Sequence, residues 1–216
     1  MSNVHPTFKP GQPDPLRRKL AKGGIALPVV LATLASKPVL GAAPYNCTIS
    51  GKISGGSTHG VDATCNHLGQ PFSYWLSPLS NWYPCDYFFT NCPLPTVAGA
   101  RKFHEAPLAS GLDPFVDAYW KNGTDSPSVY EVLRSTSAGR PPLTITSKTL
   151  ASVELGREAV VALLNALSPS MPDYPLLPQD VITIFNTVAR TGSYTTDFNE
   201  EWSQAVVLQY FKSLHG

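Results

Sequence analysis

The sequence predicts a mainly α-helical protein, with four to five helices in its C-terminal two thirds. The N-terminal third is expected to be irregular, pinned by disulfides and rich in aromatic residues. Three observations predict this class. Apolar residues recur at helical spacing in residues 111–216. Residues 44–110 are rich in Gly, Ser, Pro, Asn and aromatic residues and have no sustained helical period. All four cysteines lie within residues 47–92.

The first 43 residues have the order of segments that is typical of an export signal peptide. Residues 1–16 are rich in proline and are expected to be disordered. Cationic residues then precede the uncharged, mostly apolar residues 23–36, and small residues fit a cleavage site after Ala43. A membrane-spanning helix needs about 20 apolar residues, but this run is interrupted by Pro28 and stopped by Lys37. We expect residues 1–43 to be removed on export, and retention as an uncleaved anchor is the alternative.

The cationic segment is similar to a twin-arginine export signal, in which paired arginines precede an apolar residue and a lysine. Arg17 and Arg18 form the pair, and Lys19-Leu20-Ala21-Lys22 follows. The expected partners are therefore the twin-arginine or the general export machinery, and the expected location is the periplasm, the cell surface or the extracellular space. Residues 44–216 are expected to form a single mature domain, with loops in 44–110 and helices in 111–216.

The net charge of +1 divides unevenly along the chain. Residues 1–43 hold six Lys/Arg and one Asp, which gives +5, so the remaining residues hold ten Lys/Arg and fourteen Asp/Glu, which gives −4. A mildly acidic mature protein offers no basic face to nucleic acid and no polybasic patch to a membrane. The charge therefore argues against both classes of partner.

The four cysteines predict two disulfides in an oxidising compartment, for which three pairings exist. We favour Cys47–Cys65 and Cys85–Cys92, because each closes a short loop. The alternative is a metal site that also uses nearby histidines (His59, His67 and His104). The cysteine spacing is not that of a zinc ribbon or knuckle, so we expect neither a metal nor a cofactor.

Two short helices are expected early in the second half. DPFVDAYW, residues 113–120, begins with Asp113 as cap and Pro114 at the first helical position. SPSVYEVLRS, residues 126–135, repeats this order with Ser126 and Pro127. In the N-terminal third, by contrast, short strands are expected around the isoleucines at 49 and 53.

Three longer helices should follow, over residues 149–168, 177–192 and 196–216, because each segment carries a wide apolar stripe. The second ends with Gly192, a residue typical of helix C-termini. The third opens with Asp197 three residues before a glutamate, the spacing of a capping box.

Two stretches carry a resemblance to a family. CNHLGQPFSYWLSPLSNWYP, residues 65–84, and LGREAVVALLNAL with the following DYPLLPQDVITIFN resemble uncharacterised exported bacterial proteins with twin-arginine-like leaders. In that family a cysteine precedes a GYWKNHPxxWP-like motif, and a GRHAVAALLNA-like helix follows. Tyr74-Trp75 and Trp82 take the aromatic positions here, and Gly156 to Asn165 takes the helix. The resemblance implies export and a shared fold rather than a reaction.

The chain departs from that family pattern at three places. Ser73 stands where the motif has glycine, Leu76-Ser77 where it has Lys-Asn, and Glu158 where the helix has histidine. A polar site built on that lysine and histidine would be missing from this chain.

The sequence contains no P-loop, dinucleotide fingerprint, HExxH or EF-hand loop. The nearest approach to a hydrolase nucleophile is Ser57 with His59 in a glycine-rich run, which is more often a flexible loop. Glu154 and Glu158 share a helix face, where two carboxylates can exchange protons or hold a divalent cation. The plainer interpretation is that Arg157 and solvent neutralise an exposed face.

An aromatic cluster is the strongest binding candidate, and its central members are Tyr74, Trp75, Trp82 and Tyr83. Flat aromatic rings stack on sugars or hold partner side chains, and the alternative is that these rings fill the core. The sequence therefore favours an exported periplasmic or cell-surface structural or binding protein with a protein or glycan partner, rather than an enzyme. An exported hydrolase or redox protein of unfamiliar type is the alternative, since the twin-arginine route carries folded and cofactor-loaded proteins.

Overall fold

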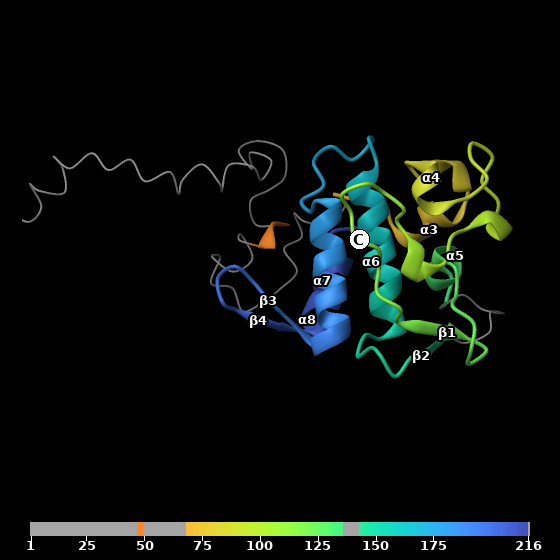
Figure 1. Cartoon of the computed structure of the whole chain (residues 1–216). Coiled ribbons are helices and arrows are strands. Elements are labelled where there is room, and N and C mark those ends of the chain that lie inside the picture. The colour runs from red at the N-terminus through yellow and green to blue at the C-terminus, as the bar shows by residue number, and fades with distance from the viewer. Residues whose placement is uncertain (1–46, 50–67, 136–142, 216) are drawn as a thin grey trace, which may run out of the picture. The chain divides into compact units, whose positions relative to one another are not determined.

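The structure, a computed structural model, describes residues 47–49, 68–135 and 143–215. In these residues the chain forms six α-helices, three 3₁₀ turns and four short strands (Figure 1). The α-helices are α3 (Phe72–Leu76), α4 (Cys85–Phe88), α5 (Val129–Leu133), α6 (Val153–Leu167), α7 (Pro178–Thr191) and α8 (Gln204–Ser213). The strands are β1 (Tyr119–Lys121), β2 (Leu143–Ile145), β3 (Ser193–Thr195) and β4 (Glu201–Ser203).

Helix α6 is the central element of the described residues, because it contacts α5, α7 and α8. It begins after Ser152, whose hydroxyl accepts a hydrogen bond from the amide of Leu155 at 3.2 Å. Ten of its residues, from Leu155 to Asn165 with one gap, are buried. The predicted helix is therefore confirmed, although it starts at Val153 rather than at 149.

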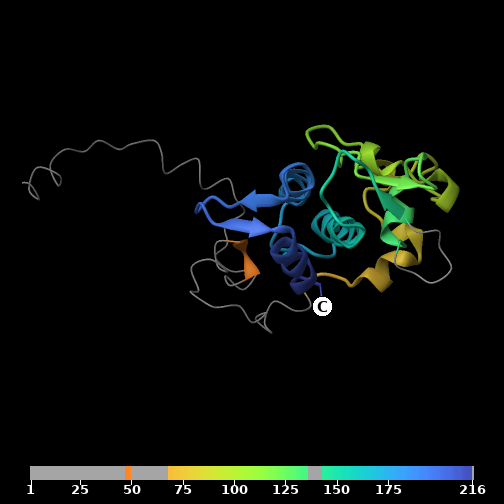
Figure 2. The ribbon, with the colours of Figure 1, turned by 90° about the horizontal axis from the view of Figure 1, so that it is seen from below.

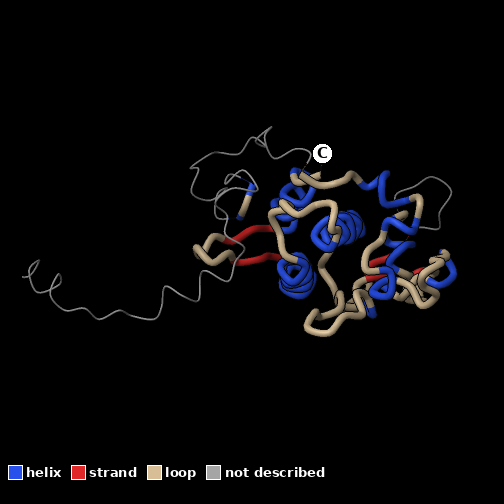
Figure 3. The backbone as a smooth tube through the Cα atoms, turned by 90° about the horizontal axis from the view of Figure 1, so that it is seen from above, coloured by secondary structure: helices blue, strands red, loops and turns tan. Residues whose placement is uncertain are grey.

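Helices α6, α7 and α8 lie next to one another when they are viewed nearly end-on (Figures 2 and 3). The antiparallel hairpin β3–β4 lies on one side of these helices, and the antiparallel pair β1–β2 lies on the other side. The mutual burial of these helices is what their apolar stripes predict. Helix α7 also ends as expected, since Gly192 adopts the left-handed conformation with φ +88°.

The prediction of a helix over residues 196–216 is wrong for the first third of this range. Ser193 pairs with Ser203 and Thr195 with Glu201 in the β3–β4 hairpin, and α8 begins only at Gln204, with Ser203 as its cap. The apolar stripe that suggested an earlier start belongs to two different structures. Trp202 lies on β4 and is buried, whereas the side chain of Phe198 at the hairpin tip is 58% exposed.

The helix predicted at residues 113–120 is absent. Residues 113–117 are irregular, and β1 follows and pairs with β2. The next predicted helix is present as α5, but its cap is Ser128 rather than Ser126. The side chain of Ser128 accepts from the amide of Glu131, and the Glu131 carboxylate accepts from the amide of Ser128, which is a complete capping box.

The Cys- and aromatic-rich segment contains short helical turns as well as loops. The disulfide Cys85–Cys92 is present and links α4 to the loop that follows it, as predicted. Cys47 is also disulfide-bonded, but its predicted partner Cys65 lies outside the described residues. Ile49 is helical rather than extended, and Ile53 lies outside the described residues.

Aromatic rings from both halves of the chain meet in the core. Phe103 and Phe115 are stacked with their ring centroids 4.6 Å apart. Phe185 of α7 meets both rings edge-on, at 5.6 Å and 5.3 Å. The N-terminal aromatic residues therefore pack against the long helices rather than forming a separate core.

All described residues belong to one compact unit, Val39–Gly216. Within them, none of the helices has both the length and the apolar character needed to span a bilayer. The predicted export segment, with Arg17 and Arg18, lies outside the described residues.

Candidate functional site

Two of the four aromatic residues predicted to bind a ligand lie in the core. Trp75 and Trp82 are each 1% exposed, and the indole NH of Trp82 donates a hydrogen bond to the carbonyl oxygen of Trp75 at 2.7 Å. The Trp82 ring makes edge contacts with Phe88 and Phe89, at centroid distances of 5.3 Å. The two tryptophans are therefore packing residues in this conformation.

The two tyrosines of the same set reach the surface. Tyr74 is 37% exposed and Tyr83 is 56% exposed. Tyr74 rests edge-on against the buried Trp75, with the ring centroids 4.9 Å apart, so its position is fixed by the core beneath it. Binding by this cluster stays a prediction, and the exposure restricts it to the tyrosines.

A different surface feature lies beside α7. An open groove of about 510 Å³ has one face of α7 as one wall and residues 113–117 as the other; we call it the α7 groove. The helix contributes side chains that recur every three or four residues, namely Gln179, Ile182, Thr183, Asn186, Thr187 and Arg190. Both walls therefore come from segments that are adjacent in space but far apart in the sequence.

The side chain of Asn186 joins the two walls by hydrogen bonds. The Asn186 amide donates to the carbonyl oxygen of Pro114 at 3.0 Å and accepts from the amide of Val116 at 2.9 Å. These bonds satisfy the carbonyl oxygen of Pro114 and the amide of Val116 without a helix over residues 113–120. They also attach this irregular segment to α7.

The groove presents polar atoms that the described residues leave without partners. The Gln179 side-chain oxygen is buried and accepts no hydrogen bond, while its amide nitrogen donates to Thr183 at 3.2 Å. Asp113 and Arg190 are exposed, and neither has an ion pair in the described part of the chain. Asp117, by contrast, is paired with Lys148 at 3.5 Å.

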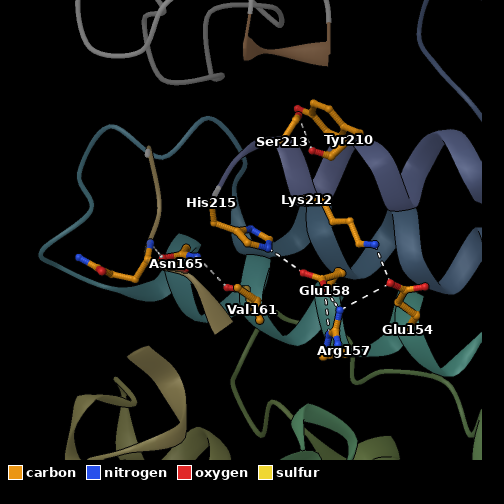
Figure 4. A network of polar contacts seen from close by, with 10 residues as sticks. Glu154, Arg157, Glu158, Val161, Asn165, Tyr210, Lys212, Ser213 and His215 are labelled. Carbon is orange, nitrogen blue, oxygen red and sulfur yellow. Dashed lines mark hydrogen bonds and ion pairs between the residues drawn. The ribbon is translucent and has the colours of Figure 1, made fainter. Parts of the chain in front are cut away.

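A second polar cluster lies between α6 and α8 (Figure 4), and its Glu158–His215 contact is shielded from solvent. One carboxylate oxygen of Glu158 accepts hydrogen bonds from Arg157, and the other lies 2.7 Å from Nε2 of His215. The side chains of Glu158 and His215 are each only 5% exposed. One turn earlier on α6, Glu154 accepts from Lys212 of α8 at 2.6 Å.

The charge of Glu158 is stabilised by these neighbours. Burial raises the pKa of a carboxyl group, but the hydrogen bonds and charges of His215 and Arg157 outweigh burial here, so the pKa of Glu158 lies below its ordinary value of 4.5. Arg157 also lies over the Phe72 ring, 5.4 Å from its centroid. The cluster therefore links α6 to His215, which follows the end of α8.

The predicted pair of carboxylates, Glu154 and Glu158, is thus split between two environments. Glu154 is 44% exposed at its side chain and Glu158 is buried, so the interpretation of a wholly exposed face is wrong for Glu158. Each carboxylate meets cations of this chain. No group of three or more His, Cys, Asp or Glu suited to a metal ion occurs among the described residues.

The same face of α6 joins segments from opposite ends of the unit. Asn165 accepts from the amide of Gln70 at 2.6 Å and donates to its carbonyl oxygen at 2.9 Å. The adjacent amide of Gly69 donates to the carbonyl oxygen of Leu214 at 3.0 Å. A side chain at Gly69 would lie 2.7 Å from Asn165, so this close approach requires glycine.

Sequence reasoning missed Gln179, Asn186, Arg190 and His215. The polar face of α7 was visible as a second stripe, opposite its apolar one, but polar faces are ordinarily solvated. His215 lies 57 residues from its partner Glu158, and no local pattern connects them. His104 and Glu105 are 3.9 Å apart on the surface, while Ser57, His59 and His67 lie outside the described residues.

Comparison of the chain with models of protein families, with curated proteins and with solved structures gives no match.

Proposed function

We propose that the protein is an exported binding protein of the periplasm or cell surface, which holds its ligand in the α7 groove. The leader with Arg17 and Arg18 supports export, and the Cys85–Cys92 disulfide is of the kind that persists in oxidising compartments. The absence of a polybasic patch from residues 44–216 supports a ligand other than nucleic acid or an anionic membrane.

The observation that carries the binding role is the unsatisfied polar lining of the groove. Buried polar atoms are ordinarily hydrogen-bonded, because an unpaired one costs about 1–3 kcal/mol. The Gln179 oxygen lacks such a bond in the described part of the chain, and it lies in the same groove as Asp113 and Arg190, which lack ion pairs there. A ligand that pairs with the exposed Asp113 or Arg190 forms ion pairs that the described part of the free protein lacks.

The buried cluster at Glu158 supports binding over catalysis. A general acid or base has to reach the substrate, but both oxygens of Glu158 are occupied by His215 and Arg157 and are shielded from solvent. The cluster stabilises the packing of α6 and offers no free carboxylate.

Export is tested by following the full chain in a bacterial host with a twin-arginine pathway. We expect the protein in the periplasm without its first 43 residues. The double variant Arg17→Lys/Arg18→Lys keeps the charge but removes the pair, and should stay in the cytoplasm; Lys9→Arg is the matched control. Periplasmic delivery of the double variant would point to the general export route, and retention of the unaltered chain in the cytoplasm would contradict export.

A binding protein is distinguished from a hydrolase or redox protein by the material recovered from the periplasm. We expect no stoichiometric metal in elemental analysis and no absorption band beyond that of the aromatic residues. A stoichiometric metal, a chromophore or turnover of ester and peptide substrates would contradict the proposal.

A further inference from the structure

The turn that follows strand β1 carries the one Asn-Gly pair of the sequence, Asn122-Gly123. Asparagine is among the thermally labile residues of proteins. We propose that this pair is a site of spontaneous covalent modification, at which the Asn122 side chain deamidates to a mixture of aspartate and isoaspartate. The pair does not line the α7 groove, so this inference is independent of the proposed function.

Asn122 and Gly123 are the central residues of a tight turn. Both have positive φ angles, 53° for Asn122 and 82° for Gly123, which is the backbone of a type I′ turn, where Asn-Gly is favoured. The amide of Thr124 donates to the carbonyl oxygen of Lys121 at 3.4 Å, and the amide of Asp125 donates to the same oxygen at 3.0 Å. The turn therefore presents the pair at the end of β1.

The atoms that have to react are accessible to solvent. Both residues of the pair are exposed, and a side chain added at Gly123 would meet no atom within 4 Å. The amide nitrogen of Gly123 donates no hydrogen bond within the described residues, whereas the amides of Thr124 and Asp125 both do. The attacking nitrogen is therefore neither covered nor held by a hydrogen bond in this part of the chain.

The reaction starts at the amide nitrogen of Gly123. This nitrogen loses its proton and attacks the side-chain carbonyl carbon Cγ of Asn122. The new C–N bond closes a succinimide ring, and the bond from Cγ to the side-chain nitrogen breaks, so this nitrogen leaves as ammonia. Water from solution then opens the ring at one of its two carbonyl carbons. One opening gives ordinary aspartate, and the other gives isoaspartate, in which the backbone runs through Cβ.

Asn199 provides an internal comparison. It has a positive φ of 60° and is exposed, like Asn122. Its successor, however, is Glu200, whose amide donates to the hydroxyl oxygen of Thr196 at 3.2 Å. The side chain of Glu200 also adds bulk beside the attacking nitrogen, and its negative charge opposes the loss of the proton. The two asparagines therefore share a backbone region but differ in the nitrogen that has to react.

The modification changes the end of β1 in two ways. Both products add a negative charge beside Lys121, whose ammonium nitrogen lies 2.9 Å from the carboxylate of Glu131. Isoaspartate also adds one atom to the backbone of the turn. The pairing of Lys121 with Asp125 depends on the length of this connection, so we expect isoaspartate to weaken it.

The test is peptide mapping by mass spectrometry of the full chain after incubation at neutral and at mildly alkaline pH. We expect the peptide with Asn122 to gain the mass that replacement of NH2 by OH adds, and to separate into two products of equal mass. The rate should rise with the hydroxide concentration, because the attacking nitrogen has to lose its proton. Asn122 should react more than about tenfold faster than Asn199, which corresponds to about 1.4 kcal/mol in activation free energy.

Two variants and one further measurement assign the products. Asn122→Asp lacks the carboxamide, so its peptide should show no mass gain, and it marks the chromatographic position of the ordinary aspartate product. Asn199→Asp is the matched control and should leave the rate at Asn122 unchanged. In the isoaspartate fraction, hydrogen exchange at the amide of Asp125 should be faster than in the unmodified protein.

A synthetic peptide of residues 119–127 reports the same chemistry outside the fold. Reaction of this peptide without reaction of the folded chain would overturn the proposal, because the turn would then protect the pair. Equal rates at Asn122 and Asn199 would also overturn it, since the glycine and its unbonded amide would then have no effect.

Discussion

At the scale of single residues, Glu158 is a charged side chain held in the interior of the protein. It is buried, charged and bonded at both oxygens, by Arg157 and by His215. Buried ion pairs contribute little net stability when complete, because desolvation offsets the attraction. Removal of one partner leaves an uncompensated charge, which costs about 3–5 kcal/mol.

We therefore expect Glu158→Gln to lower the free energy of unfolding by about 3 kcal/mol. The measurement is chemical denaturation at neutral pH, followed by circular dichroism. Glu154→Gln is the matched control, since it lies one turn away on the same helix and is half-exposed; its cost should stay below about 1 kcal/mol. Equal effects of the two variants would contradict the structural role of the buried pair.

The lowered pKa of Glu158 predicts a specific dependence of stability on pH. A carboxyl group whose pKa is lower in the folded state contributes stability above its unfolded value of about 4.3, and this contribution is lost as pH falls through the folded value. The melting temperature should therefore fall as pH is lowered from 4.5. The fall should be shallower in Glu158→Gln, although not absent, because the pKa of Glu131 is lowered too.

Gly156 illustrates a residue whose role is to leave space. A Cβ at this position would lie 2.7 Å from Cζ of the buried Tyr119, whose hydroxyl donates to the carbonyl oxygen of Ser152 at 2.7 Å. Alanine would favour the helix by up to about 1 kcal/mol, but overpacking costs about 1–3 kcal/mol.

Gly156→Ala should thus destabilise the protein by about 1–2 kcal/mol in equilibrium unfolding. In the background of Tyr119→Leu, which removes the colliding ring atoms, the same change should cost less or become favourable. Additive losses in the double variant would refute the collision.

At the scale of elements, the α7 groove depends on the connection between α7 and residues 113–117. Asn186→Ala removes two hydrogen bonds to backbone groups, each worth about 1 kcal/mol. We expect a loss of about 2 kcal/mol in unfolding free energy and faster hydrogen exchange at the amide of Val116. Thr187→Ala, on the same face of α7, is the control and should leave that exchange rate unchanged.

The long helices could be predicted because their signals are local. In α6 and α7 the apolar stripe, the cap and the following glycine or proline all lie within one segment. The β3–β4 hairpin could not be predicted, because Trp202 on β4 and the apolar residues of α8 fall by coincidence on one helical stripe. The irregular segment at 113–117 could not be predicted for another reason. Asp113 and Pro114 are typical of a helix start, but Asn186, some 70 positions away, hydrogen-bonds the backbone of this segment instead.

The candidate site was predictable only in part, for the same reason. An aromatic cluster is visible in the sequence. Whether a given ring faces the core or the solvent, however, depends on the local conformation of the backbone. Trp75 and Trp82 are buried, whereas the neighbouring Tyr74 and Tyr83 are exposed. The α7 groove and the Glu158–His215 pair depend on contacts between segments that are far apart in the sequence. No local pattern in a single sequence indicates such contacts.

At the scale of the whole molecule, the proposed export route and the disulfide place folding and disulfide formation in different compartments. The twin-arginine route carries folded proteins, whereas disulfides form in the oxidising compartment beyond it. On this proposed route the chain is expected to fold before Cys85 and Cys92 are joined. The loop between them is short, with a separation of seven residues, so its closure adds only about 2–3 kcal/mol in the chain-entropy description.

We expect the double variant Cys85→Ala/Cys92→Ala to keep the helical circular dichroism spectrum and to lose about 2–3 kcal/mol of unfolding free energy. The unaltered protein with reductant serves as the comparison. A chain that loses its helical signal without this bond would contradict folding before export.

The contacts of Gly69 with Leu214 and of Glu158 with His215 have a consequence for synthesis on the ribosome. The N-terminal segments and the middle of α6 emerge long before the residues that complete them. Until residues 212–215 have been made, one carboxylate oxygen of Glu158 lacks its His215 partner and the amide of Gly69 lacks an acceptor. Chains stalled before residue 212 should therefore remain sensitive to protease, while chains released after residue 215 become resistant. We therefore expect the protein to complete its folding late in synthesis and in one cooperative step.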